Sequence, residues 1–298
     1  MSSSNHHDKV DRQFGEQAQA YLTSQVHAKG NDLDYLTATL KSYPDARVLD
    51  MGCGAGHVSF IAAQTTKEVV AYDLSTDMLN VVAAMAKERQ YHNLSVTQGI
   101  AEKLPFPDQS FDIVLSRYSA HHWQDVGKGM REAYRVLKPG GKIIIIDVVS
   151  PGHPVFDIWL QTVEALRDTS HVRDYTPGEW MTFFTESGFI IDRVQRERLP
   201  LNFATWITRM RTPEHFVKAV RAYQQSSSQE VNRYFELQED GSFTSDLMII
   251  EELVLFNSAF DSYCLIEYVL SGQYNTYPFE KYVENQILAL SPTLCSFT

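Results

Sequence analysis

The chain has few cysteines, and this excludes two classes of protein. Its three cysteines, Cys53, Cys264 and Cys295, show neither a disulfide spacing nor a metal-binding spacing among the 298 residues. A disulfide-stapled secreted domain is cysteine-dense, and a structural zinc site needs ligands at short, regular intervals. We therefore expect no disulfide framework and no metal ion. We interpret Cys53 as a small space-filling residue rather than a nucleophile.

Long apolar runs and a targeting segment are also missing. No run of about 18 apolar residues occurs, so the sequence predicts no membrane-spanning helix. Residues 1–10 are polar and lack the apolar core of a signal peptide. We expect a cytoplasmic protein whose residues 1–10, with His6 and His7, form a disordered tail.

The chain has fewer basic than acidic residues, 26 against 37. The formal net charge is -11, and the pI is near 5.4. Because an acidic chain is repelled by phosphate backbones, nucleic acid is not expected as a partner. The two basic stretches, 193–198 and 209–221, are interrupted by acids or spread along helix-like runs. We interpret both as solvated faces.

The most informative stretch is 47–57, with the sequence RVLDMGCGAGH. A short apolar strand runs into an acid and a turn with three glycines, and an apolar helix-like run follows. Gly52, Gly54 and Gly56 lack Cβ atoms, so the backbone can turn sharply and a ligand can approach it closely. The free N–H groups at the start of the helix would point toward that ligand.

The spacing of the glycines distinguishes between cofactors. It is G-x-G-x-G, which differs from the G-x-G-x-x-G dinucleotide fingerprint, and no Gly-Lys-Ser/Thr follows as in a P-loop. No lysine or arginine lies near the turn in sequence, which disfavours a phosphate-rich ligand. Asp50 at the mouth of the turn suits a ligand with a cationic end. A tight turn without any ligand remains the alternative.

A second acid supports a ligand site. Residues 69–74 (VVAYDL) read as a strand that ends in Asp73. In a βαβ unit this acid lies beside the first turn, where it can accept two hydrogen bonds from a ribose diol. An acid at a strand end is often only a helix cap, but Ser75 or Thr76 could cap the next helix instead.

These motifs together resemble a known family. The chain contains in order D-x-G-x-G-x-G at 50–56, DLS at 73–75 with ML at 78–79, AEKLPF at 101–106, FD at 111–112, HHW at 121–123 and LKPGG at 137–141. They are similar to the class I S-adenosylmethionine-dependent methyltransferases, in particular to the ubiquinone/menaquinone-biosynthesis C-methyltransferases. The resemblance is strong over about 10–150, loose over 150–250 and absent beyond. It implies S-adenosyl-L-methionine as cofactor and a small-molecule methyl acceptor.

The predicted fold is α/β, with a doubly wound, mostly parallel, seven-stranded Rossmann-like sheet. Strands are expected at 46–51, 68–73, 94–98, 111–117 and 142–149, and helices at 57–65, 76–90 and 124–137. This alternation implies a parallel sheet with right-handed crossovers. The run 143–146 (IIII) suits a strand buried on both faces. A further strand at 189–197 and a late antiparallel strand at 243–250 would complete the sheet.

Around this sheet we expect a methyltransferase domain over 11–251 with a helical lid. The lid elements are expected at about 12–40, 153–187 and 203–235. In the family, an N-terminal helix packs over the cofactor, so Tyr21 either covers its methionine end or is simply core. Residues 252–298 do not fit the domain. They form a helical appendage, a contact in a homodimer, or a sequence without selected structure.

The resemblance assigns further cofactor contacts. The turn at 99–102 holds the adenine ring in the family, which places Ile100, Ala101 and Glu102 at that ring. An acid is common where this chain has Ile100, so Ile100 is expected to pack on the ring face instead. Glu102 is either an adenine-side acceptor or a solvent-facing residue. The remaining cofactor contacts by resemblance are Leu74, Met78 and Ser116, although Met78 also begins an inward packing stripe.

Two histidines are the catalytic candidates. Because ligands bind at the carboxyl ends of the strands in open α/β sheets, His121 and His122 are expected next to the transferable methyl group. A histidine pKa near ~6.5 suits proton removal at neutral pH. A base, a substrate anchor or plain packing all remain open, with His121 favoured as substrate-facing. Asp147 and His153 are secondary candidates.

The predicted function is therefore methyl transfer from S-adenosylmethionine to a small, quinone- or phenol-like acceptor. Two alternatives stand beside it. One is a non-catalytic sensor that binds S-adenosylmethionine. The other is a nicotinamide-dependent oxidoreductase, which the glycine spacing and the late strand oppose.

Overall fold

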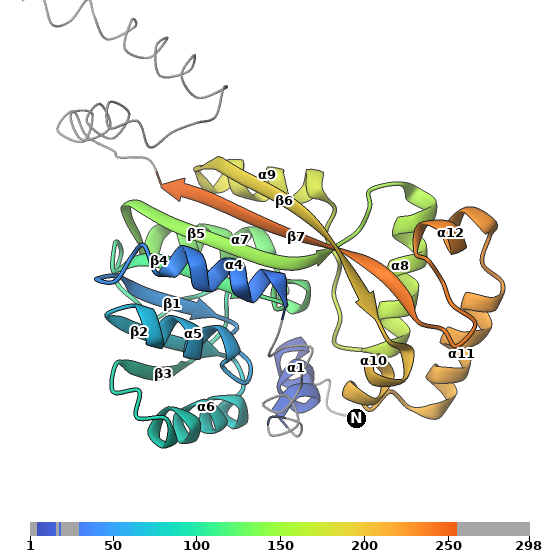
Figure 1. Cartoon of the computed structure of the whole chain (residues 1–298), viewed down its shortest axis with the longest axis horizontal. Coiled ribbons are helices and arrows are strands. Elements are labelled where there is room, and N and C mark those ends of the chain that lie inside the picture. Colours follow the sequence, from blue (N-terminus) through green and yellow to red (C-terminus); the bar gives the residue numbers. More distant parts are fainter. Residues whose placement is uncertain (1–4, 16–17, 19–29, 255–298) are drawn as a thin grey trace, which may run out of the picture. The chain divides into compact units, whose positions relative to one another are not determined.

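The computed structural model describes residues 5–15, 18 and 30–254 (Figure 1). Tyr21 and the predicted extension lie outside these residues, except for the extension's first three residues, 252–254. The strands are β1 (Arg47–Met51), β2 (Glu68–Asp73), β3 (Leu94–Gln98), β4 (Phe111–Arg117), β5 (Leu137–Val149), β6 (Phe189–Leu201) and β7 (Phe243–Val254). The helices are α1 (His6–Gly15), α4 (Asn31–Leu40), α5 (His57–Thr65), α6 (Thr76–Glu88), α7 (Val126–Val136), α8 (Pro154–Arg167), α9 (Pro177–Ser187), α10 (Phe203–Arg209), α11 (Glu214–Gln225) and α12 (Gln229–Tyr234).

The strands form one sheet in the order β3-β2-β1-β4-β5-β7-β6. Strands β1 to β5 pair in parallel, whereas β7 is antiparallel to both of its neighbours, β5 and β6. The predicted fold class, a mostly parallel seven-stranded sheet with a late antiparallel strand, is confirmed. The order reverses at β1, whose neighbours are β2 and β4, and this is where open α/β sheets bind ligands.

Helices cover both faces of the sheet, and β5 shows why. Ile143 and Ile145 belong to the core under α7 and α9, whereas Ile144 and Ile146 belong to the core under α4 and α5. Successive side chains of a strand point to opposite faces, so a run of four isoleucines serves two cores at once. The prediction of a strand buried on both faces is confirmed.

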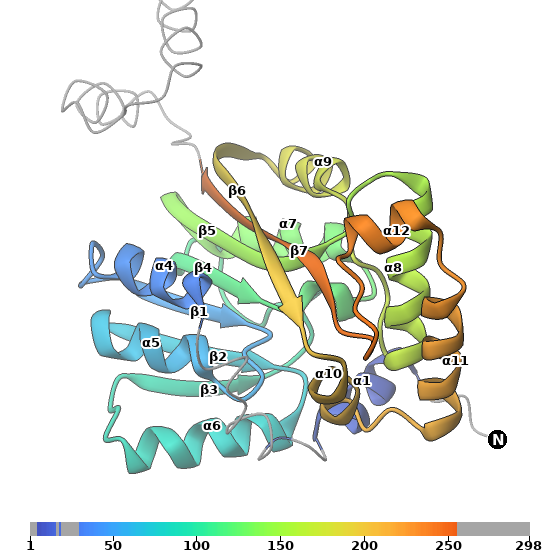
Figure 2. The same ribbon diagram turned by 45° about the vertical axis from the view of Figure 1, so that its right-hand side comes forward.

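A third apolar core joins the helices beyond the carboxyl end of β5. Helix α8 packs with α10, α11 and α12, as Figures 1 and 2 show from two sides. Its largest members are aromatic: Trp159 stacks on Phe235, and Trp206 meets the edge of Phe243. These helices lie in the predicted lid ranges 153–187 and 203–235, whereas α9, within the first of these ranges, packs on the sheet. A lid role for them stays a prediction.

Several expected boundaries were wrong. The predicted tail over 1–10 is helical from His6, because α1 packs against residues far along the chain: the His6 ring lies 2.9 Å from the His122 carbonyl and Gln13 donates to the Met210 carbonyl. The domain end at 251 falls inside β7, which continues to Val254 because β6 pairs with it from Phe189 onward. Likewise, β5 begins at Leu137 rather than at 142, because Leu137 already pairs with Phe111 of β4.

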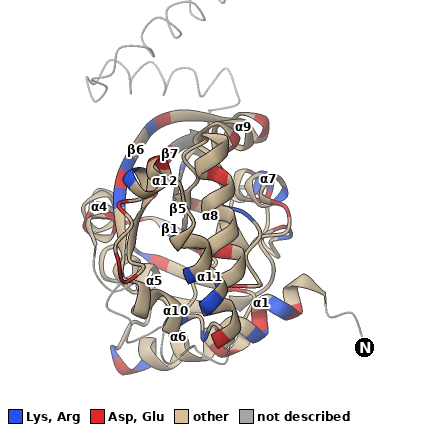
Figure 3. Cartoon of the chain, turned by 90° about the vertical axis from the view of Figure 1, so that its right-hand side faces the viewer, with Lys and Arg blue, Asp and Glu red and all other residues tan. Residues whose placement is uncertain are grey.

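Arginines in both basic stretches have partners within the protein. Arg196 and Arg198 on β6 both donate to the buried Asp246, and Arg221 donates to Gln224 and to the Glu239 carbonyl. Figure 3 shows acidic residues interspersed with the basic ones in this view. In the part of the chain that the structure describes, no helix combines the length and the apolar character needed to cross a bilayer.

Candidate active site

The glycine turn between β1 and α5 builds one wall of a cavity. All three glycines have left-handed backbones, with φ of 77° at Gly52, 51° at Gly54 and 86° at Gly56. The turn is held by the Gly52 and Cys53 amides, which both donate to the Tyr72 carbonyl at the end of β2 (2.8 and 3.0 Å). The two neighbouring strand ends are therefore tied together at the point where the sheet order reverses.

Each glycine is required for a different reason. A Cβ on Gly52 would lie 1.9 Å from the Ser119 hydroxyl oxygen, and one on Gly56 would lie 2.9 Å from a Val82 methyl. A Cβ on Gly54 would meet nothing within 4 Å, although Gly54 lines the cavity. Gly54 is therefore the position where a side chain would extend into open space instead of into the protein.

The first cavity gathers most of the predicted cofactor residues. Its lining includes Asp50, Gly52, Gly54, Asp73, Leu74, Met78, Ile100, Ala101 and Glu102. Gly56 and Ser116 are not among the lining residues. Gly56 faces Val82 and Phe60 in the core, and Ser116 is buried within β4. Their contact with a cofactor stays a prediction.

Two carboxylates at the strand ends dominate the electrostatics of the first cavity. Asp73 accepts hydrogen bonds from the Gly54 and Ser75 amides, both at 2.8 Å, and Asp50 accepts one from the Ser59 hydroxyl at 2.5 Å. Burial, with the charge of Asp73, raises the pKa of Asp50 to about 7 against the Ser59 hydrogen bond. Burial also raises the pKa of Asp73. Such sites favour a positively charged partner, since it would restore the ionised form.

Glu102 and Ile100, which are expected at the adenine ring, both line the first cavity and both make hydrogen bonds within the protein. Glu102 lines the first cavity, and its Oε1 accepts hydrogen bonds from the Gln124 and Asp125 amides at 2.8 and 3.2 Å. It thus anchors the segment that enters α7. The contact of Glu102 with an adenine ring stays a prediction. The Ile100 carbonyl accepts a hydrogen bond from the Tyr72 hydroxyl at 2.9 Å. Ile100 is also one of the residues that line the first cavity.

The structure brings further residues to the first cavity that the sequence did not indicate. Arg117, at the end of β4, lines it and donates to Asp32 of α4 at 2.5 Å, so a cation does lie near the turn. Helix α1 contributes His7, Val10 and Phe14. Neither contribution has a local sequence signal, since both depend on contacts between segments far apart in the chain.

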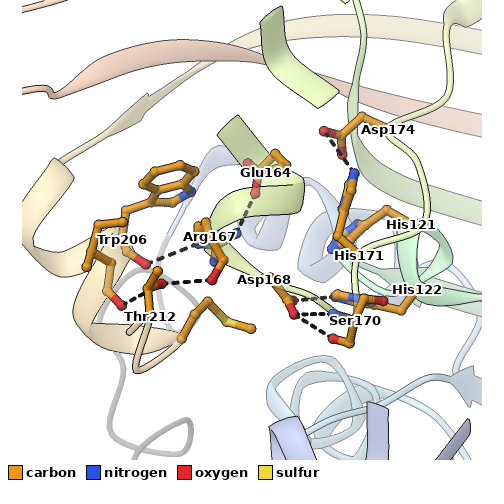
Figure 4. A network of polar contacts seen from close by, with 12 residues as sticks. His121, His122, Glu164, Arg167, Asp168, Ser170, His171, Asp174, Trp206 and Thr212 are labelled. Carbon is orange, nitrogen blue, oxygen red and sulfur yellow. Dashed lines mark hydrogen bonds and ion pairs between the residues drawn. The ribbon is translucent and has the colours of Figure 1, made fainter. Parts of the chain in front are cut away.

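A second cavity adjoins the first and shares Phe14, Tyr118 and His122 with it. It extends toward α8 and α10. Its other lining residues are His121, Val148, Glu164, Arg167, Asp168, Asp174, Leu199, Leu201, Trp206, Arg209 and Met210. Figure 4 shows the polar members of this group and the contacts among them. An acceptor held here would lie beside whatever fills the first cavity.

The two candidate histidines lie at this junction, with ring centroids 4.2 Å apart. His121 donates from Nδ1 to Asp147 at the end of β5 (2.6 Å), and no described residue bonds to its Nε2. His122 donates from Nδ1 to the Ser170 carbonyl at 3.2 Å and lines both cavities. Asp147 is thus in direct contact with the pair, and its role at the substrate stays a prediction. His153, by contrast, is exposed at the start of α8 and lines neither cavity.

The pKa values of the two rings move in opposite directions. Burial disfavours protonation of His121, but the charge and hydrogen bond of Asp147 outweigh it and raise the pKa to about 9. Burial, with the positive charge of His121, lowers the pKa of His122 to about 4. A third ring, His171, lies 5.7 Å from His121 between centroids, and burial lowers its pKa as well. When the pKa values of two neighbouring groups are pushed apart in this way, one group holds its proton at a pH at which the other is deprotonated.

A glycine turn and two strand-end acids at the switch point of a 3-2-1-4-5-7-6 sheet are the hallmarks of the class I S-adenosylmethionine-dependent methyltransferases. The chain belongs to this family, and its cofactor is S-adenosyl-L-methionine. A family model described as "Methyltransferase domain" matches residues 49–145. Among the described residues, no group of three or more histidines, cysteines or acids is arranged to hold a metal ion.

Its relatives include three informative proteins. The uncharacterized protein YafE of Escherichia coli K12 is 59% identical over 200 residues, which cover 67% of this chain and 97% of YafE. The uncharacterized methyltransferase YcgJ of Bacillus subtilis is 36% identical over 222 residues, 74% of this chain and 88% of YcgJ. The crystal structure of YcgJ superposes with a TM-score of 0.73 at 34% identity, covering 76% of this chain and 99% of that one. Demethylmenaquinone methyltransferase of Chlorobaculum parvum is 37% identical over 112 residues, 37% of this chain and 44% of that protein.

Proposed function

We propose that the chain transfers a methyl group from S-adenosylmethionine to a small phenol- or quinol-type acceptor in the second cavity. The observation that carries this proposal is the pair of adjoining cavities with His122 at their junction and His121 beside it. The apolar wall of the second cavity, which includes Phe14, Leu199 and Trp206, suits an aromatic ring. The similarity to demethylmenaquinone methyltransferases over part of their length agrees with such a ring.

The first cavity would hold the cofactor. Asp73 would accept hydrogen bonds from the ribose hydroxyls of the cofactor. The amino-acid end of the cofactor would lie at the open side of Gly54, and Asp50 would balance the charge of its ammonium group. When bound, the cofactor supplies an already activated methyl group on a sulfonium sulfur. The protein therefore has mainly to align the acceptor with that group and to exclude water.

The acceptor must also lose a proton, and we assign this step to His121. In its neutral form, Nδ1–H donates to Asp147, so the lone pair is on Nε2, which no described residue occupies. Nε2 can then take the proton of an acceptor hydroxyl while Asp147 stabilises the resulting imidazolium. Removal of this proton activates the oxygen of a phenol, and equally its ring carbon, so both methylation sites are compatible with the arrangement.

Methyl transfer to a panel of phenols and quinols would test the proposal. The protein is incubated with S-adenosylmethionine labelled in its methyl group, and products are identified by mass spectrometry. Labelled product from at least one acceptor, reduced at least ~100-fold in H121N, is the expected result, since positioned acid–base groups contribute about 10²–10⁴-fold. Tight binding of S-adenosylmethionine without transfer to any acceptor would instead favour a non-catalytic sensor.

A further inference from the structure

The second cavity has an apolar part and an acidic end. Tyr118 and Phe14 lie at the junction with the first cavity, whereas Glu164 and Asp174 line only the second. Both acids are buried, with 5% and 1% of their surface exposed. Buried acids are rare unless a cation or hydrogen-bond donors compensate them. The partners of each acid therefore indicate what the cavity is built to receive.

Two of the three acids in the lining have partners within the protein. Glu164 accepts from Arg167 at 2.6 Å, and the same guanidinium also donates to the Trp206 carbonyl. One oxygen of Asp168 accepts from the Ser170 amide and hydroxyl at 2.8 and 2.6 Å, and the other lies 3.8 Å from His122 (Figure 4). Each of these two carboxylates therefore has at least one hydrogen-bond donor within the protein.

Asp174 differs from the other two. Its buried Oδ2 accepts no hydrogen bond. Nε2 of His171 lies 3.8 Å from this oxygen, beyond hydrogen-bond distance, and 3.3 Å from Gln161 Oε1. The Asp174 backbone is fixed on both sides by Gln161, through contacts of 3.1 and 2.7 Å. Since the residue is held in place, its carboxylate oxygen remains without a donor at the wall of a cavity.

We propose that Asp174 binds a protonated amino group on the methyl acceptor, at the end of the second cavity remote from the cofactor. This inference rests on the proposed function, because it names a chemical feature of the acceptor in that same cavity. An ammonium group supplies both the missing hydrogen bond and the missing positive charge. The acceptor would then be an aromatic ring that presents its hydroxyl to His121 and its amino group to Asp174.

The surroundings of Asp174 favour a cation over a neutral hydroxyl. Burial and the charge of Glu164 raise the pKa of Asp174 well above its ordinary range, and Asp147 acts in the same direction. His121 and Arg167 lower it, but each already bonds to another acid. Binding an ammonium group would oppose this shift, because a nearby positive charge favours the ionised form of the carboxylate.

Calorimetric binding to the S-adenosylhomocysteine complex tests this inference without requiring turnover. The probes are 4-(aminomethyl)-, 4-(2-aminoethyl)- and 4-(3-aminopropyl)phenol, each paired with the neutral 4-alkylphenol of equal length. We expect at least one amine to bind about 10-fold or more tightly than its neutral partner, since hydrogen bonds to charged groups contribute about 1.5–3 kcal/mol.

The isosteric variant D174N should remove the amine preference. E186Q, which alters an exposed acid on α9, serves as the matched control and should retain it. Undiminished binding of S-adenosylhomocysteine shows that D174N is folded. No preference for any amine, or a preference that persists in D174N, would overturn the inference. If amines bind more tightly but are not methylated, the proposed function fails and the amine site stands. If neutral phenols are methylated and amines bind no more tightly, the proposed function stands and the amine site fails.

Discussion

Alanine at Gly54 and alanine at Gly56 should produce opposite defects, although the two positions share one turn. At Gly54 the added methyl group would meet no protein atom within 4 Å, and the cost of folding is limited to the left-handed backbone. That cost is about 1–2 kcal/mol for an L-residue. The methyl group would, however, occupy space that we assign to the cofactor. We expect affinity for S-adenosylhomocysteine to fall at least ~10-fold, or about 1.4 kcal/mol.

At Gly56 the same substitution affects the core instead. The new Cβ would lie 2.9 Å from Val82 and 3.0 Å from Phe60, so overpacking adds about 1–3 kcal/mol to the backbone cost. We therefore expect G56A to lose about 2–5 kcal/mol of unfolding free energy while binding more tightly than G54A once folded. Chemical denaturation without ligand and calorimetric titration with S-adenosylhomocysteine measure the two quantities. If G54A bound as well as wild type, or if G56A proved the weaker binder, the assignment of the turn would be refuted.

Four further predictions concern other parts of the protein. D73N should weaken S-adenosylhomocysteine binding at least ~10-fold, because hydrogen bonds to a charged carboxylate are worth about 1.5–3 kcal/mol each; an unchanged isotherm would count against the ribose assignment. Methyl transfer should rise with pH toward a plateau above about 9, because His121 must be deprotonated to act and its pKa is raised to that value. The free energy of unfolding should instead fall as the pH rises. The protonated His121–Asp147 pair stabilises the fold fully below the unfolded-state pKa of ~6.5, and this contribution is lost as the pH rises through 9. The melting temperatures of wild type and H121N should therefore converge at high pH. A rate independent of pH between 6 and 9 would move the role of base to His122. Finally, truncation after Val254 should leave S-adenosylhomocysteine binding intact, since β7 completes the sheet at that residue; lost binding would show that later residues belong to the site.

The sheet could be predicted from sequence because its signals are local. Strand β2 and helix α5 have the predicted bounds, since an apolar run that ends in Asp73 and a helix that begins directly after Gly56 both have clear limits. The meeting of Asp73 with the glycine turn was also predictable, because neighbouring parallel strands end at the same edge of a sheet.

The lining of the second cavity could not be predicted in the same way. Glu164 and Asp168 are four residues apart around the end of α8, a pattern that normally marks a solvated helix face. Their burial depends on the packing of α8 against α10 and α11, which no local pattern encodes. Helix α1 is a second example. His6 reads as part of a polar tail, and only its contact with His122, 116 positions later, shows that it belongs to the fold.

The central place of β7 has a consequence for synthesis of the chain on the ribosome. This strand lies between β5 and β6 and is the only hydrogen-bonding neighbour of β6 in the described sheet, yet it is the last of the three to be made. Until Phe243–Val254 emerge, β5 presents an open edge rich in isoleucine, and such edges recruit other chains. The nascent protein therefore passes through a stage in which about a hundred residues separate an exposed strand from the segment that covers it.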